Sequence, residues 1–248
     1  MTLCIGISKY SGCSPWANDA NDASDVATAL RGMGYAVTHL ADAQASYKSM
    51  RNALDEFAAS LRPGGVAFVF FSGHGMRGHD GNNYLLPVEG VSHYRDLSTD
   101  ALSLERINAR LEGSKCLLHV VISDACRSDP PPMKSDTKSE LPKGFKVLVV
   151  PPAEAGSVMS YSCDPGEVSW DGASDGGRNG PFTTALLKHL TTPELHVETL
   201  FTRVASDCQQ LTRHHEKLQR PWKSANLTCA VSSSHQPRNA RAFEAALC

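Results

Sequence analysis

Short apolar runs alternate with stretches of helical period along most of the chain. This alternation predicts an α/β fold with a mostly parallel sheet. The third and fourth apolar runs lack polar positions almost throughout, which is typical of central strands covered on both faces. We expect strands at Leu3–Ile7, Ala36–Leu40, Val66–Phe71, Cys116–Ile122 and Ser157–Tyr161.

Four segments repeat their apolar residues at the spacing of a helix that buries one face. They cover residues 18–33, 50–61, 104–111 and 197–211. The last is the most regular, and we expect it to pack on the sheet. The helix at 50–61 is followed by Arg62, Pro63 and two glycines, which are residues that end helices.

Two segments lack the apolar surface needed to offset the entropy of ordering them. The segment from Asp129 to Gly144 is rich in Pro, Lys, Ser and acidic residues, and the tail SSHQPRNARAFEAALC resembles it in composition. We expect an exposed, mobile loop in the first case and a flexible tail in the second.

The charge balance excludes some partners. The chain has 24 basic and 26 acidic residues and a net charge of −2, so we expect no nucleic-acid partner and no attraction to an anionic membrane. No apolar run reaches the roughly 18 residues of a membrane span, and the N-terminus has no signal-peptide pattern. The eight cysteines include no CxxC pair. These features predict a cytoplasmic protein with reduced thiols.

Two reactive side chains follow the two central strands. The strand at 66–71 runs into the motif SGHG, which contains His74, and the strand at 116–122 runs into SDACR, which contains Cys126. Open α/β sheets bind ligands beyond the carboxyl ends of their strands, so both side chains are expected at one crevice. An imidazole beside a thiol assists thiolate formation and protonates a leaving amine.

Each residue alone has an ordinary structural explanation. A histidine at a strand end is commonly a satisfied structural residue, and a cysteine after an apolar strand is commonly part of the core. The two motifs together favour a catalytic pair. The residue at position 132 argues against a cysteine phosphatase, because that class needs an arginine with five residues between it and the cysteine, and position 132 is Pro.

The segments FFSGHGMRGHDGNNYLLPVE and VVISDACRSD resemble the His and Cys motifs of caspase-like cysteine peptidases, and are closest to the paracaspase and metacaspase branch. The similarity extends from LCIGISKY through GGRNGPFTTALLKHL to QRPWKSANL, which is nearly the whole chain. It implies a caspase-like three-layer α/β sandwich over residues 1–232. Within it, 1–129 would form a large-subunit-like region, 130–145 a flexible linker and 146–232 a small-subunit-like region, before a tail at 233–248.

The resemblance also implies an activity. Such a protein is a cysteine endopeptidase with a His74 and Cys126 dyad, and the backbone N–H groups of Gly75 and Cys126 form its oxyanion hole. Paracaspases and metacaspases cut after Arg or Lys through an acidic pocket, for which the matching residues here are Asp22, Asp124 and Glu167. We therefore expect cleavage after Arg, then Lys. Asp22 as a helix N-terminal acid and Glu167 as a solvated charge remain alternatives.

The expected partners are protein or peptide substrates with Arg or Lys at the cleavage site, and a second copy of the chain pairing through a last strand near Asn226–Val231. No cofactor is expected. Calcium stays open through Asp171 and Asp175, although their spacing is not that of an EF-hand. Self-cleavage at the linker lysines also stays open. The alternatives to a paracaspase-like enzyme are a catalytically weak or inactive scaffold and a calcium-dependent metacaspase.

Overall fold

The computed structural model describes residues 1–11, 18–126, 156–164, 167, 169–170, 177–214 and 218–227. Eight strands form one sheet, and the main path runs β2-β1-β3-β6-β7-β8. Every neighbouring pair on this path is parallel except β7 and β8. The strands are β1 (Thr2–Gly6), β2 (Val37–Ala41), β3 (Val66–Arg77), β4 (Asn83–Leu85), β5 (Leu102–Ser103), β6 (Leu118–Cys126), β7 (Gly156–Tyr161) and β8 (Trp222–Asn226).

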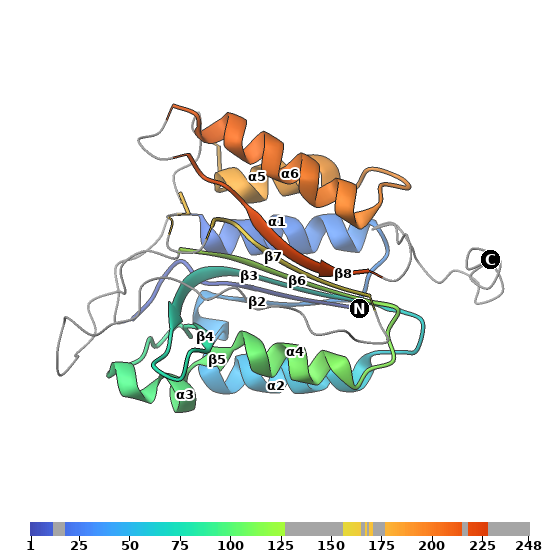
Figure 1. Ribbon diagram of the computed structural model, residues 1–248. Helices are drawn as coiled ribbons and strands as arrows, with labels where there is room; N and C mark the ends of the chain where they lie inside the picture. The colour runs from blue at the N-terminus through green and yellow to red at the C-terminus, as the bar shows by residue number, and fades with distance from the viewer. Residues whose placement is uncertain are drawn as a thin grey trace.

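Helices cover both faces of this sheet (Figure 1). Helices α1, α5 and α6 lie on one face, and α2 and α4 lie on the other. Their bounds are α1 (Asp19–Gly32), α2 (Tyr47–Ser60), α3 (Leu97–Asp100), α4 (Leu104–Glu112), α5 (Pro181–Leu190) and α6 (Val197–Thr212), with 3₁₀ turns η1 (Asp42–Gln44) and η2 (Tyr94–Asp96). The predicted α/β sandwich with a mostly parallel sheet is confirmed.

Strand β3 shows why the sheet is buried on both sides. Its residues alternate between the two cores, as the period of two of a strand requires. Phe68 and Phe70 pack in the cluster with α1, α5 and α6, whereas Val69 and Phe71 pack in the cluster with α2 and α4. An apolar run without polar gaps is therefore what this position in the sheet demands.

Three features differ from the sequence expectations. Strands β3 and β6 continue past their apolar runs to Arg77 and Cys126, because pairing with each other and with β4 extends them. The last described strand is Trp222–Asn226 rather than Asn226–Val231; residues 228–231 lie outside the described part of the chain. Helix α5 and the short β4 and β5 were not expected as separate elements.

The close packing of β1 on α1 gives a test of the fold. An alanine at position 6 is expected to destabilise the protein by about 2 kcal/mol, because its Cβ would lie 2.5 Å from both the Ala23 Cβ and the Asp19 carbonyl oxygen. Denaturant titration of the variant and the wild type measures the change in the free energy of unfolding. Gly32→Ala is the matched control, since no atom lies within 4 Å of an added Cβ there. Equal stability of Gly6→Ala and wild type would contradict this packing.

Candidate functional site

The pairing of β3 with β6 places the two reactive residues side by side. The two strands are parallel, and the Cα of His74 is the register partner of the Cα of Cys126. Neighbouring strands lie about 4.8 Å apart, so the backbones of the two residues are adjacent. His74 is buried, with 8% of its surface exposed. A histidine and a cysteine thus occupy paired positions of β3 and β6 where the parallel ladder ends.

Tyr10 fixes the backbone and the ring of His74. The His74 N–H donates to the Tyr10 Oη at 2.7 Å, and the two ring centroids are 4.6 Å apart with the planes tilted by 52°. On the other side, the His74 carbonyl accepts from the Leu86 N–H at 3.0 Å. The preceding residue, Gly73, has φ +154°, and a Cβ there would lie 2.4 Å from the Tyr10 Oη. Sequence reasoning did not identify Tyr10.

Gly75 lies one residue beyond His74, where β3 leaves β6 and begins to pair with β4. Its register partner is Leu85 in the antiparallel β4. Gly75 is half-buried. The residue expected to serve the oxyanion hole therefore stands at the same edge as the histidine and the cysteine.

Asp22 is buried beneath this edge. Its Oδ1 accepts from the Asn179 Nδ2 at 3.0 Å and from the Gly180 N–H at 3.1 Å, and its Oδ2 accepts from the Ser72 Oγ at 3.3 Å. Burial, followed by the charge of Asp124, raises the pKa of Asp22 from 3.8 to about 8. The Asp22 carboxyl therefore holds a proton at neutral pH when nothing else occupies the site.

Asp124 lies next to Asp22 in this buried region and two residues before Cys126. Its Oδ1 accepts from the Ser169 Oγ at 3.1 Å, and its Oδ2 accepts from the Thr183 Oγ1 at 2.8 Å. Asp124 is also the register partner of Ser72, whose hydroxyl contacts Asp22. The structure thus brings together two of the three acids expected in the pocket.

The described contacts of Glu167, the third acid, come from its backbone. Its carbonyl accepts from the Cys163 Sγ at 3.4 Å, and its N–H donates to the Asp164 carbonyl at 3.0 Å. Glu167 is half-buried. Among the contacts of the described residues, none joins its carboxylate to Asp22 or Asp124.

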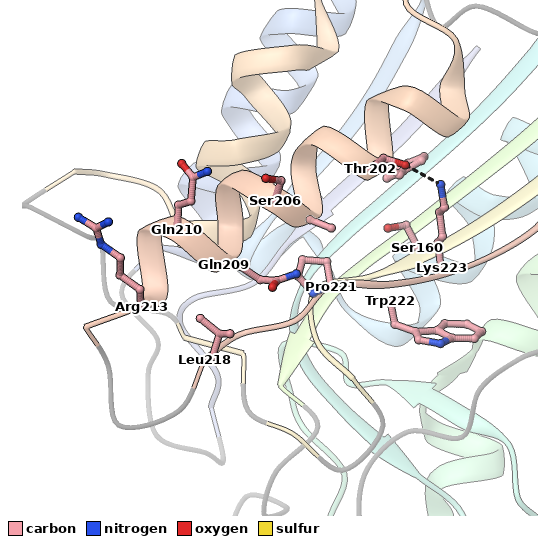
Figure 2. Close-up of a pocket in the computed structure, with 12 residues that line it drawn as sticks. Ser160, Thr202, Ser206, Gln209, Gln210, Arg213, Leu218, Pro221, Trp222 and Lys223 are labelled. Carbon is pink, nitrogen blue, oxygen red and sulfur yellow. Dashed lines mark hydrogen bonds between the residues drawn. The ribbon is translucent and has the colours of Figure 1, made fainter.

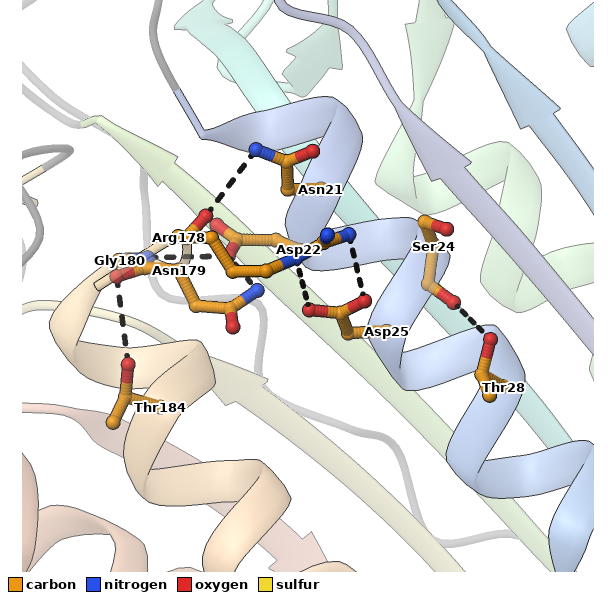
Figure 3. Close-up of polar contacts among 9 residues, drawn as sticks. All are labelled: Asn21, Asp22, Ser24, Asp25, Thr28, Arg178, Asn179, Gly180 and Thr184. Carbon is orange, nitrogen blue, oxygen red and sulfur yellow. Dashed lines mark hydrogen bonds and ion pairs between the residues drawn. The ribbon is translucent and has the colours of Figure 1, made fainter.

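Segments from both parts of the chain hold the two aspartates. Figure 3 shows residues 178–180, ahead of α5, meeting the first turns of α1. The Arg178 guanidinium pairs with both carboxylate oxygens of Asp25 at 2.8 and 2.9 Å, and the Asn21 side-chain amide donates to the Arg178 carbonyl at 3.3 Å. This contact fixes Asn179 and Gly180 where they can bind Asp22 (Figure 3).

Gln219 holds Ser169, a hydrogen-bond partner of Asp124, in place. Its buried side-chain amide donates to the Ser162 carbonyl at 2.9 Å and to the Ser169 Oγ at 3.2 Å, and its Oε1 accepts from the Trp170 N–H at 3.0 Å. Ser169 is thereby held against the Asp124 carboxylate. We did not predict the roles of Asn179, Ser169 and Gln219 from the sequence. No local sequence pattern marks a residue whose hydrogen-bond partner is more than forty positions away.

A separate groove of about 660 Å³ lies between α6 and β8 (Figure 2). Its apolar lining comes from Phe201 and Ala205 of α6 and from Pro221 and Trp222. His74, Cys126 and the two aspartates do not line it.

Within the described ranges, no three His, Cys, Asp or Glu side chains gather as a metal site, while Asp171 and Asp175 lie outside those ranges. None of the helices described is long and apolar enough to cross a membrane.

Comparison with known proteins shows which family and which fold the chain resembles. The family model for the caspase domain matches residues 1–231. The chain is 27% identical over 207 residues to the mucosa-associated lymphoid tissue lymphoma translocation protein 1 of Homo sapiens, which covers 84% of this chain and 23% of that protein. It is 26% identical over 186 residues to the Mus musculus homolog, which covers 75% of this chain and 21% of the homolog. This chain therefore spans less than a quarter of these relatives.

Among solved structures, the crystal structure of protein GSU0716 from Geobacter sulfurreducens matches with a TM-score of 0.67 at 18% identity. The match covers 95% of this chain and 96% of that one. At this identity the likeness shows the fold alone. The resemblance and the fold class expected from the sequence are confirmed.

The buried Asp22 predicts a particular dependence of stability on pH. Its pKa is higher in the folded protein than the ordinary value of 3.8, so the stability it confers is present at low pH and is lost as pH rises through about 8. The free energy of unfolding should therefore fall between about pH 4 and pH 8 and level off above that range. Asp22→Asn should flatten this fall and be more stable than wild type at the alkaline end.

Denaturant titrations at a series of pH values measure both proteins. The exposed Glu56 of α2 provides the control Glu56→Gln, which removes a carboxylate and should keep the wild-type slope. Parallel pH dependence in wild type and Asp22→Asn would show that Asp22 is not the titrating group.

Proposed function

Because the chain belongs to the caspase domain family of peptidases, we propose that it is a cysteine endopeptidase of the paracaspase type that cleaves after Arg, and less efficiently after Lys. Cys126 is the nucleophile and His74 is its acid–base partner. The observation that carries this proposal is the register of β3 and β6, in which His74 stands opposite Cys126 at the carboxyl edge of the sheet.

The chemistry follows from these two groups. The Cys126 thiol transfers its proton to His74, and the sulfur attacks the carbonyl carbon of the scissile peptide bond. The N–H groups of Gly75 and Cys126 donate to the oxyanion of the tetrahedral intermediate. The imidazolium then gives its proton to the leaving amine, and an acyl-enzyme remains. Water, deprotonated by His74, hydrolyses that thioester and restores the thiol.

The two buried aspartates support specificity for a cation. A guanidinium presents several donors in a planar fork that suits carboxylates. Each carboxylate oxygen of Asp22 and Asp124 can accept more than one hydrogen bond, so their bonds to the surrounding serine, threonine and amide groups leave room for a substrate donor. An arriving cation would lower the pKa of Asp22 and release its proton. Glu167 enters this proposal as a third, more exposed acid.

The first test is peptide hydrolysis. Purified protein is expected to cleave fluorogenic peptides ending in Arg, then Lys, and not those ending in Asp. Cys126→Ala and His74→Ala should each lower kcat by about 1,000-fold or more. Rates are measured with calcium and with a chelator, and we expect them to be equal.

Three other results of the hydrolysis test would contradict parts of the proposal. Loss of activity in the chelator would make the protein metacaspase-like. Cleavage after Asp would overturn the assignment of the pocket. An absence of hydrolysis under every condition, dimer-promoting salts included, would favour an inactive scaffold.

The second test concerns the pocket. Asp22→Asn and Asp124→Asn should each lower kcat/KM for the Arg peptide by about 10- to 100-fold, because each removes a charge-assisted hydrogen bond. Glu56→Gln is the surface control. Agmatine, a small guanidinium compound, should bind Cys126→Ala more tightly as pH rises through about 8, since Asp22 must lose its proton.

Calorimetric titration at several pH values measures this binding. The background Cys126→Ala is used because it removes the thiol, whose ionisation falls in the same pH range. The double variant Asp22→Asn with Cys126→Ala should lose the pH dependence. Pocket specificity would be refuted if both aspartate variants kept the wild-type preference for Arg.

A further inference from the structure

We propose that Tyr10 is a positioning residue for the catalytic histidine. The inference rests on the proposed dyad and extends it, because it assigns a role to a residue that lies outside both the His and the Cys motifs. Tyr10 acts in two ways: its hydroxyl holds the His74 backbone at 2.7 Å, and its ring limits the orientation of the imidazole at a centroid distance of 4.6 Å.

The segment that carries Tyr10 is itself anchored at both ends. The Asp42 Oδ1 accepts from the Ser8 N–H at 2.8 Å and from the Lys9 N–H at 2.9 Å. Beyond Tyr10, the Ser11 N–H donates to the Val88 carbonyl at 2.8 Å. Tyr10 is buried, with 7% of its surface exposed. It therefore reaches His74 from a fixed base rather than from a free loop.

Gly73 makes the approach of Tyr10 feasible. A Cβ at this residue would lie 2.4 Å from the Tyr10 Oη and 2.9 Å from the Phe71 Cζ. Any larger residue would push the phenol off the strand and remove the acceptor of the His74 N–H. The first glycine of the SGHG motif thus has a local function, which is to admit Tyr10.

Catalysis by the dyad needs this restraint. The imidazole must face the sulfur to take its proton and later face the leaving amine to return it. At His74 the pairing of β3 with β6 ends and its pairing with β4 begins, and this backbone pairing does not orient the ring, which needs side-chain contacts to hold it. A misplacement of about 1 Å can lower a rate by about 100-fold. The Tyr10 hydroxyl and ring supply contacts to both parts of His74.

The experiment compares two substitutions that separate the hydroxyl from the ring. Tyr10→Phe keeps the ring and removes the acceptor, and we expect kcat for the Arg peptide to fall about tenfold with KM unchanged. Tyr10→Leu removes both, and we expect a fall of about 100-fold in kcat, again with little change in KM. Asp42→Ala, which loosens the base of Tyr10, should lower kcat in the same manner.

A second measurement is independent of turnover. The rate of alkylation of Cys126 by iodoacetamide is followed against pH, and its inflection reports thiolate formation. Wild type should show an inflection below the value of about 8.5 for an ordinary cysteine. Tyr10→Leu should move the inflection toward that of His74→Ala. Cys126→Ala identifies the background from the other thiols.

The matched control is Tyr84→Phe. Tyr84 is buried and donates to the Asp80 Oδ2 at 2.6 Å, so this variant also removes one phenol hydrogen bond. It should keep the wild-type kcat and alkylation profile. Circular dichroism and thermal unfolding confirm that each variant is folded; if Tyr10→Leu is not, Tyr10→Phe and Asp42→Ala carry the test.

The outcomes separate this inference from the dyad itself. Wild-type kcat and an unchanged alkylation profile in folded Tyr10→Leu, or in Tyr10→Phe and Asp42→Ala together, would overturn the role of Tyr10 while the dyad stands. A change in KM alone would overturn it as well, since it would indicate substrate binding. If His74→Ala leaves the alkylation profile of wild type intact, the dyad fails and the role of Tyr10 falls with it.

Discussion

The parallel pairing of β3 with β6 is the constraint on which the site depends. Nine residues of each strand are in register, from Val66 opposite Leu118 to His74 opposite Cys126. The first part of this register lies among apolar side chains that are packed on both faces of the sheet. A slip of one residue would exchange the faces of all of them. The core therefore sets the alignment of the histidine with the cysteine.

Ser72 links this alignment to the two buried aspartates. It is the register partner of Asp124, and its hydroxyl donates to Asp19 at 2.8 Å and to Asp22 at 3.3 Å. The pairing of Ser72 with Asp124 thus places one carboxylate beside another on α1, two residues before the pairing of His74 with Cys126. Two buried acids so close together oppose each other's ionisation, which destabilises the empty site. An arrangement that weakens the fold is typical of a site shaped for a ligand of opposite charge.

The sequence predicted most of what apolar periodicity controls. The central strands, α1, α2, α4 and α6 lie where their patterns place them, because each buries one continuous apolar face or run. Helix α5 was missed because it buries polar Thr183 beside Phe182 and Leu186, which interrupts the apolar pattern. Strand β8 was placed too late, since its sequence WKSAN is polar and only half-buried. The positions of His74 and Cys126 after two neighbouring apolar strands predicted that both lie at one edge of the sheet, and the structure pairs them there.

The supporting contacts were beyond sequence reasoning for a physical reason. Tyr10 and His74 are 64 positions apart, and Asp22 and Asn179 are 157 apart. Hydrogen bonds of this kind depend on how whole elements pack, and neither partner needs a recognisable neighbourhood. The same holds for the anchoring of Tyr10 by Asp42, which joins the end of β1 to the turn after β2. Motifs identify the reacting groups, whereas the restraint on them comes from tertiary contacts.

Both parts of the chain contribute to the contacts of the two buried aspartates. Asp22, Ser72 and Asp124 come before residue 127, whereas their partners Ser169, Asn179, Gly180 and Thr183 come after residue 155. Neither part holds a satisfied pair of buried carboxylates alone, since each lacks either the acids or most of their donors. The sheet joins the parts through β6 and β7, whose six register pairs run from Leu118 opposite Gly156 to Ser123 opposite Tyr161. This pairing ends just before Asp124, so on the β7 side that carboxylate is held by its polar contacts to Ser169 and Thr183. The two aspartates therefore gain most of their hydrogen-bond donors only when the second part of the chain packs on the first, and the cation site proposed for them depends on that packing.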